Sequence, residues 1–170
     1  RHAAKTPKKT AFIFEGNKPG ESHAISFKDL LGHVSCFANV LKSKGVQKGD
    51  VVTLYMPMIL EAMYAMLACA RIGAIHNVVF GGFSASALAD RVDDCDSKII
   101  ITADGSVRGP KTISLKETVD MALDESKKNT VQTIITIKNI GSTCHMKDSR
   151  DFWYQDLAKG MSTTCAIEPM

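Results

Sequence analysis

The sequence predicts an α/β fold, with a mostly parallel sheet covered by helices on both faces and a short β-hairpin before it. Strand-like apolar runs at 51–56, 75–80 and 98–103 alternate with longer helical patterns, which is typical of βαβ units. The run KIIITA at 98–103 is an unbroken β-branched segment, as in a strand buried on both faces. Glycines at 45 and 73 end two of the helical patterns. Together these observations predict part of a three-layer, doubly wound sheet.

The first elements follow from local patterns. Residues 10–15 (TAFIFE) predict a strand, and NKPG at 17–20 predicts the turn to a short return strand that ends near Ile25. Ser26 and the acidic residue three positions later form an N-cap pair that opens a helix ending at Gly45. A buried strand at 51–56 comes next. The following helix, at about 59–72, is apolar nearly all round, so we expect it to be covered on most sides.

The second half continues the alternation. A strand at 75–80 leads into a glycine turn, and either Ser84 or Ser86 caps a helix to about residue 95. A loop at 104–111 follows the buried strand 98–103. Ser114 and Glu117 predict a capping box for a helix to about residue 128. A strand at 133–140 and a last helix at about 151–158 follow, and we expect Trp153 to anchor that helix.

Composition excludes several classes of protein. The chain has 170 residues and a net charge of +3 without a strong basic cluster, so a nucleic-acid partner is not expected. The apolar run at 62–70 is bounded by Glu61 and Arg71, far short of the ~20 residues of a membrane span. Five scattered cysteines form no CxxC pair, which favours a reducing compartment over a disulfide framework.

Two loops at strand ends are candidate ligand sites, because open α/β sheets bind ligands outside the carboxyl ends of their strands. The first contains Phe80, Gly81 and Gly82, where paired glycines let the backbone approach a ligand beneath an aromatic ring. On pattern alone, a tight turn that needs glycine for left-handed dihedral angles is the alternative interpretation.

The second candidate is the bend Arg108, Gly109, Pro110 and Lys111, in which two cations bracket a Gly-Pro pair. An arginine fork and a lysine charge can hold phosphate oxygens, although a solvent-exposed basic loop is the alternative. Neither loop matches the Walker or dinucleotide-binding pattern. The five histidines are scattered, and no nucleophile stands with a base, so we predict no catalytic residue and no metal site in this sequence.

Residues 56–95, which include ACARIGA and FGGFS, closely resemble the AMP-forming acetyl-CoA synthetases (acetate–CoA ligases) of the adenylate-forming superfamily. The similarity extends through 37–42, 98–104, 107–109 and 168–170, and so covers essentially the whole chain. It implies that 1–170 is a single partial domain, the amino-terminal part of the large domain. The family's Ser/Thr/Gly-rich phosphate loop and its C-terminal domain are not in this sequence.

The resemblance also implies an activity. The family uses ATP with Mg²⁺ to convert acetate to an acetyl-adenylate, which the CoA thiol then attacks to give acetyl-CoA and AMP. This chain would supply part of the CoA site and be inactive alone. The implied CoA-binding residues are Phe80, Gly81, Gly82, Arg108, Gly109, Pro110, Lys111 and Ile113. Pro110 departs from the family, which has a small residue there.

Further expectations follow from the same resemblance. The partners would be acetate, ATP, CoA and the remainder of the large domain. The compartment would be the cytoplasm, with nuclear and mitochondrial forms left open. A propionyl-CoA synthetase segment is one alternative, and a truncated non-catalytic product that binds CoA or another chain is a second.

Overall fold

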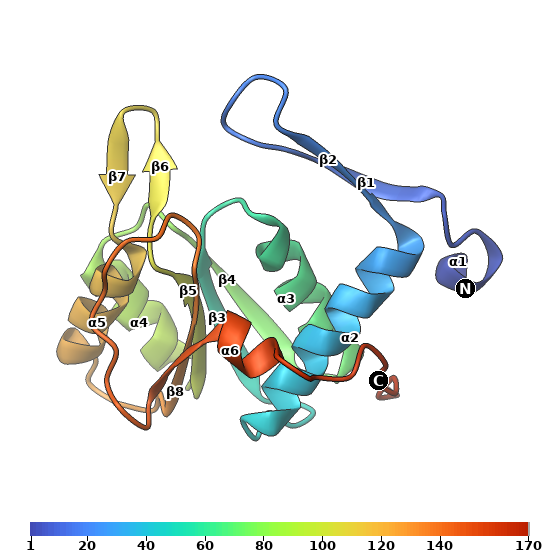
Figure 1. Cartoon of the computed structure of the whole chain (residues 1–170). Helices are drawn as coiled ribbons and strands as arrows, with labels where there is room; N and C mark the ends of the chain where they lie inside the picture. The colour runs from blue at the N-terminus through green and yellow to red at the C-terminus, as the bar shows by residue number, and fades with distance from the viewer. Residues whose placement is uncertain (170) are drawn as a thin grey trace.

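A computed structural model describes residues 1–169 of the chain, and its centre is one five-stranded sheet (Figure 1). Every neighbouring pair in this sheet is parallel, which confirms the predicted topology. In spatial order the strands are β4 (Ile75–Phe80), β3 (Val51–Met56), β5 (Ile99–Ala103), β8 (Thr133–Ile137) and β9 (Asp151–Trp153).

Helices cover both faces of the sheet, so the three-layer, doubly wound prediction is also confirmed (Figure 1). One face carries α2 (Phe27–Ser43), α3 (Leu60–Arg71) and α6 (Tyr154–Ala158). The other carries α4 (Ala85–Asp94) and α5 (Leu115–Glu125), which pack against each other. No helix within residues 1–169 is both long enough and apolar enough to span a bilayer.

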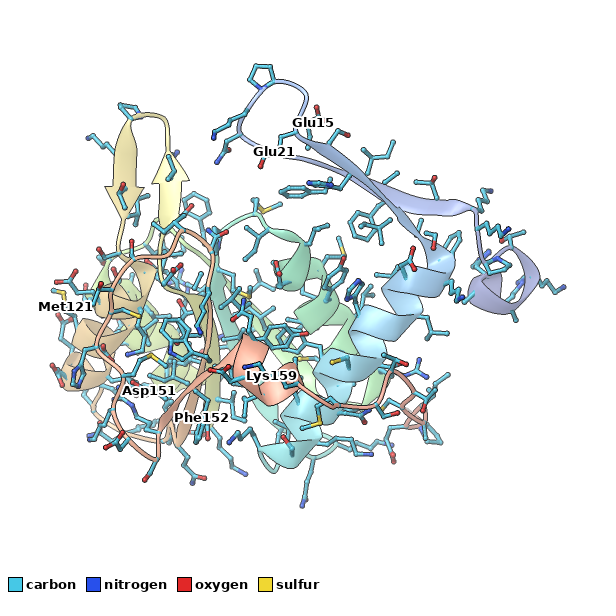
Figure 2. The ribbon with its side chains drawn as sticks, viewed as in Figure 1. Glu15, Glu21, Met121, Asp151, Phe152 and Lys159 are labelled. Atoms are coloured by element: carbon cyan, nitrogen blue, oxygen red, sulfur yellow. The ribbon has the colours of Figure 1, made fainter. Side chains whose placement is uncertain are left out.

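The predicted N-terminal hairpin is present as β1 (Thr10–Glu15) and β2 (Ser22–Ser26), which pair antiparallel. It projects as an arm beyond the main body, and Figure 2 shows Glu15 and Glu21 beside its turn. A four-residue helix before it, α1 (His2–Lys5), was not predicted.

Local capping signals were correct at two helix starts. The Ser26 hydroxyl accepts a hydrogen bond from the amide of Asp29 at 3.2 Å and donates to that residue's carboxylate at 2.7 Å. Of the two serines proposed for α4, Ser84 is the cap, because its hydroxyl accepts from the amide of Ala87 at 3.3 Å. Gly45 follows α2 with a φ of 82°, a conformation that favours glycine.

Two expectations about helices were wrong. The apolar helix α3 is covered only on the side of Tyr64, Ala65, Ala68 and Cys69, while Met63 and Leu67 are 39% and 37% exposed. The main packing partners of α3 among the described residues are α2 and the strands β3 and β4, while the C-terminal segment hydrogen-bonds only to its last residue, Arg71. The capping box of α5 does not form either: Ser114 makes no side-chain cap hydrogen bond, and the helix ends at Glu125.

The predicted loop at 104–111 is instead the base and first strand of a second hairpin, formed by β6 (Ser106–Arg108) and β7 (Lys111–Ile113). Gly109 and Pro110 make its two-residue turn, in which Arg108 pairs with Lys111. Gly109 has a φ of 58° and is followed by proline. A positive φ followed by proline's fixed negative φ suits a tight hairpin turn of the II′ kind.

Two later boundaries also differ from prediction. The strand β8 ends at Ile137 rather than residue 140, because the amides of 139–142 turn toward the Asp104 carboxylate. The first three residues of the predicted helix 151–158 form β9, and the helix begins at Tyr154. Tyr154, not Trp153, anchors it: the Tyr154 ring stacks on Phe37 with centroids 4.4 Å apart and is 8% exposed.

Candidate functional site

The carboxyl ends of β3 and β5 form a crevice where the direction of chain winding reverses. From β3 the chain continues into α3 on one face of the sheet, and from β5 it continues through the β6–β7 hairpin into α5 on the other (Figure 1). Such reversal points are where open α/β sheets bind ligands. A cavity of about 770 Å³ opens at this position.

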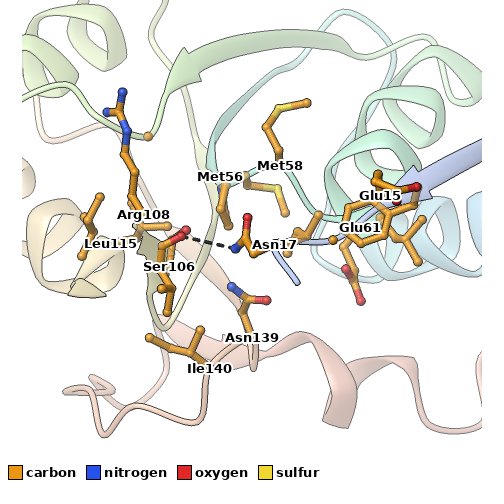
Figure 3. A pocket seen from close by; sticks show the side chains of 18 of the residues that line it. Glu15, Asn17, Met56, Met58, Glu61, Ser106, Arg108, Leu115, Asn139 and Ile140 are labelled. Atoms are coloured by element: carbon orange, nitrogen blue, oxygen red, sulfur yellow. Dashed lines mark hydrogen bonds between the residues drawn. The ribbon is translucent and has the colours of Figure 1, made fainter. Parts of the chain in front are cut away.

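Five parts of the chain enclose the cavity (Figure 3). They are the N-terminal hairpin, the loop after β3, the glycine turn after β4, the β6–β7 hairpin, and the loop after β8. The Asn17 side-chain amide donates to the carbonyl of Val107 at 3.4 Å, so the turn of the N-terminal hairpin meets strand β6 across the opening. Segments more than a hundred residues apart therefore share one hollow.

The structure brings five of the eight predicted ligand residues to this cavity: Phe80, Gly81, Gly82, Arg108 and Ile113. The other three do not line it. Gly109, Pro110 and Lys111 lie at or next to the tip of the β6–β7 hairpin, beyond the wall that Arg108 contributes. The two candidate loops therefore meet at one cavity, the second through Arg108 rather than as a whole.

The paired glycines are explained by space and not by left-handed dihedral angles. Neither Gly81 nor Gly82 has a positive φ, which contradicts the alternative interpretation of the turn. A Cβ on Gly81 would lie 3.1 Å from the carbonyl oxygen of Met56, and one on Gly82 would lie 2.6 Å from the Phe80 ring. Glycine is therefore what lets this turn pass close to β3 beneath its own aromatic ring.

A cation faces the aromatic ring at the cavity edge. The Arg108 guanidinium carbon lies 5.8 Å from the centroid of the Phe80 ring, and Phe80 meets Phe83 edge to face at 5.9 Å. Phe80 is 58% exposed, so its face is accessible to a ligand. A guanidinium beside an open ring can hold an anionic group and a flat base together.

A buried tyrosine supports the glycine turn from below. The Tyr55 hydroxyl donates to the carbonyl of Phe83 at 2.8 Å, and Tyr55 is 1% exposed. Burial raises the pKa of this phenol, so it stays a protonated donor at neutral pH. Tyr55 lies in a plain strand pattern, and nothing in the sequence indicated this contact.

Other lining residues also escaped the sequence analysis. Asn139 and Ile140 come from the loop after β8, and Met58 from the loop after β3. Three carboxylates, Glu15, Glu21 and Glu61, also line the cavity. Its charge is mixed, with Arg108 at one wall and Lys18 among the acidic groups of the N-terminal hairpin. Within residues 1–169 no cluster of histidine, cysteine or carboxylate side chains could hold a metal ion.

Comparison with known proteins identifies relatives along the whole chain. The model of the AMP-binding enzyme family matches residues 1–160. Acetyl-coenzyme A synthetase from Bradyrhizobium diazoefficiens is 49% identical over 170 residues, and acetyl-coenzyme A synthetase 1 from Pseudomonas aeruginosa is 50% identical over the same length. In both cases the match covers 100% of this chain and 26% of the relative.

A solved structure agrees with these relatives. Acetoacetyl-CoA synthetase from Streptomyces lividans superposes with a TM-score of 0.86 at 25% sequence identity, over 99% of this chain and 25% of the other. The chain thus spans about a quarter of the length of the proteins that it matches. By the family model, which covers most of its length, the chain belongs to the AMP-binding enzymes.

Proposed function

We propose that this chain is part of an acetate–CoA ligase and supplies one side of its CoA site. The observation that carries the proposal is identity of 47–51% to acetyl-coenzyme A synthetases along all 170 residues, with the double-glycine turn and Arg108 on one cavity. Acetate, ATP with Mg²⁺ and CoA would then be the small molecules of the complete protein. The names of the relatives favour acetate over propionate, and the cytoplasm is the compartment we propose.

The cavity has the chemistry that the nucleotide end of CoA requires. CoA carries phosphate groups and a flat adenine, and Arg108 can pair with the first while Phe80 and Ile113 pack against the second. Gly81 and Gly82 let the turn pass close to β3 and beneath the Phe80 ring, so this exposed ring stands at the edge of the cavity. Lys111, next to the hairpin turn, would meet phosphate only at the rim of the site.

Binding is the role that we assign to this segment, and adenylation is not. No residue lining the cavity forms a nucleophile with its base, and the family's phosphate loop is not in the sequence. ATP and Mg²⁺ would activate acetate elsewhere in the complete protein. We therefore expect no acetate-dependent exchange between pyrophosphate and ATP from residues 1–170 alone; exchange above background would contradict this assignment.

A chimaera tests the proposal. Residues 1–170 would replace the aligned quarter of Pseudomonas aeruginosa acetyl-coenzyme A synthetase 1, and two rates would be measured: pyrophosphate exchange without CoA, and acetyl-CoA formation. Arg108→Ala should weaken CoA use by ~1–3 kcal/mol, the range for a lost charge-assisted contact, and leave exchange largely intact.

The matched control is Arg91→Ala. The Arg91 guanidinium also lies over an aromatic ring, 4.6 Å from the centroid of Phe83, but Arg91 does not line the cavity. It should leave the KM for CoA unchanged. A chimaera that forms acetyl-CoA with an unaltered KM for CoA after Arg108→Ala would refute the assignment of this cavity to CoA.

A further inference from the structure

Asp104 is a buried carboxylate at the carboxyl end of β5, directly before the β6–β7 hairpin, and it is 1% exposed. Its two oxygens accept five hydrogen bonds, all from backbone amides. Oδ1 accepts from Gly105 at 2.7 Å, Asn139 at 2.9 Å and Ile140 at 3.1 Å. Oδ2 accepts from Gly141 at 2.8 Å and Ser142 at 3.1 Å.

The five amides belong to two segments far apart in the sequence. Gly105 opens the hairpin that carries Arg108, and the other four amides belong to the loop after β8. Amides that converge on one carboxylate stabilise its negative charge without a counter-ion. They also fix the backbone, because each donor has only that partner. Asp104 thereby fastens the loop 139–142 to the base of the hairpin.

Both fastened segments form walls of the cavity. Asn139 and Ile140 line it from one side, and Ser106 and Arg108 line it from the hairpin. The same junction has one more hydrogen bond and is closely packed. The Asn139 side chain donates to the carbonyl of Gly105 at 2.9 Å, and a Cβ on Gly105 would lie only 2.7 Å from Ile140.

We infer that Asp104 is a positioning residue of this site: it holds the Arg108 hairpin and the Asn139–Ile140 wall in register, although it does not line the cavity itself. The inference rests on the proposed CoA site, because it concerns how that site is shaped. It differs from a purely structural role, which would affect the stability of the chain and both half-reactions alike.

Asp104→Asn is the test, because asparagine keeps the volume while its NH2 group replaces an oxygen that accepts two or three of the five hydrogen bonds. In the chimaera it should raise the KM for CoA on the order of 10-fold and change pyrophosphate exchange less than about 2-fold. In the 170-residue chain, amide hydrogen exchange at 139–142 and 105–108 should accelerate.

The control is Asp151→Asn, which alters another buried carboxylate whose partners, Lys116, Lys147 and Arg150, do not line the cavity. It should lower stability and leave the KM for CoA unchanged. Should Asp104→Asn fail to fold, Ser142→Pro is the milder variant, because it deletes one of the five donors at a residue outside the lining.

The outcomes separate this inference from the proposed function. Faster amide hydrogen exchange at 139–142 with an unchanged KM for CoA overturns the positioning role but does not affect the proposed CoA site. Equal losses in exchange of pyrophosphate and in CoA use overturn it as well, because they indicate general unfolding. If Arg108→Ala also leaves the KM for CoA unchanged, the proposed function itself has failed.

Discussion

Lys116 is a fully buried ammonium in a cluster of charges between α5 and the segment that leads into β9. Its Nζ lies 2.7 Å from a carboxylate oxygen of Asp120, 2.9 Å from Oδ2 of Asp151 and 2.9 Å from the carbonyl of His145. Arg150 completes the cluster with 2.6 Å to Asp151 and 2.7 Å to Asp120. The side chains of Lys116 and Asp151 are both 0% exposed.

Replacing Lys116 by methionine keeps the aliphatic stem and removes the charge. Breaking a buried ion pair costs about 3–5 kcal/mol, because the remaining charge stays buried without its partner. Here Asp151 keeps Arg150 and the amide of Lys147, at 2.8 Å, so the lower end of that range applies. A loss of about 3 kcal/mol is a large part of the 5–15 kcal/mol typical of a domain.

Urea unfolding of the 170-residue chain measures the effect, with Lys98→Met as control. Lys98 pairs with Asp50 at 3.1 Å but its side chain is 56% exposed, so this substitution should cost about 0–1 kcal/mol. If the unfolding free energies of the two variants differ by less than about 1 kcal/mol, the reasoning is refuted, because burial would then not determine how much an ion pair contributes to stability.

Three further predictions use the same unfolding assay or a labelling assay. Gly105→Ala should destabilise the fold by roughly 1–3 kcal/mol, because its Cβ would lie 2.8 Å from a backbone oxygen. Its control, Gly32→Ala in α2, has room for the Cβ and should stabilise the fold by roughly 0.5–1 kcal/mol. Equal effects of the two substitutions would contradict this prediction. Burial would raise the pKa of Asp151, but hydrogen bonds, first among them that of Arg150, outweigh it and hold this pKa below its usual value. The carboxylate therefore stabilises the fold above its unfolded pKa of about 3.9, and this contribution is lost as pH falls through the lower folded pKa. Asp151→Asn should reduce the loss of unfolding free energy between roughly pH 5 and roughly pH 2. An unchanged dependence of that free energy on pH would contradict this prediction. Burial raises the pKa of Cys69 to about 12, so this thiol should be the slowest of the five to react with a thiol reagent, and early labelling at Cys69 would show otherwise.

Long periodic segments could be predicted from the sequence, and short ones could not. The β-branched run at 99–103 and the apolar face of α2 each repeat over enough residues to identify a strand and a helix. By contrast β6, β7 and β9 have three residues each, which is too few for a period to show. Their pairing depends on partners elsewhere in the chain.

The candidate site divides in the same way. Phe80 to Gly82 and Arg108 stood out because glycine pairs and cations after strands are local signals. Asp104 and Asn139 gave no such signal, since their contacts join residues 34 to 38 positions apart. A single aspartate after a strand looks like any loop residue until the loop it holds is placed in space.

The strand β4 lies at one end of the sheet and pairs only with β3 among residues 1–169, so its outer row of backbone amides and carbonyls is open. Ile75, Val78 and Phe80 along it are 56%, 57% and 58% exposed. An apolar strand with a free edge is a template on which a second chain can add. We therefore expect the isolated segment to self-associate along β4. Dilution, or replacement of the exposed Val78 by a charged residue, should reduce this association.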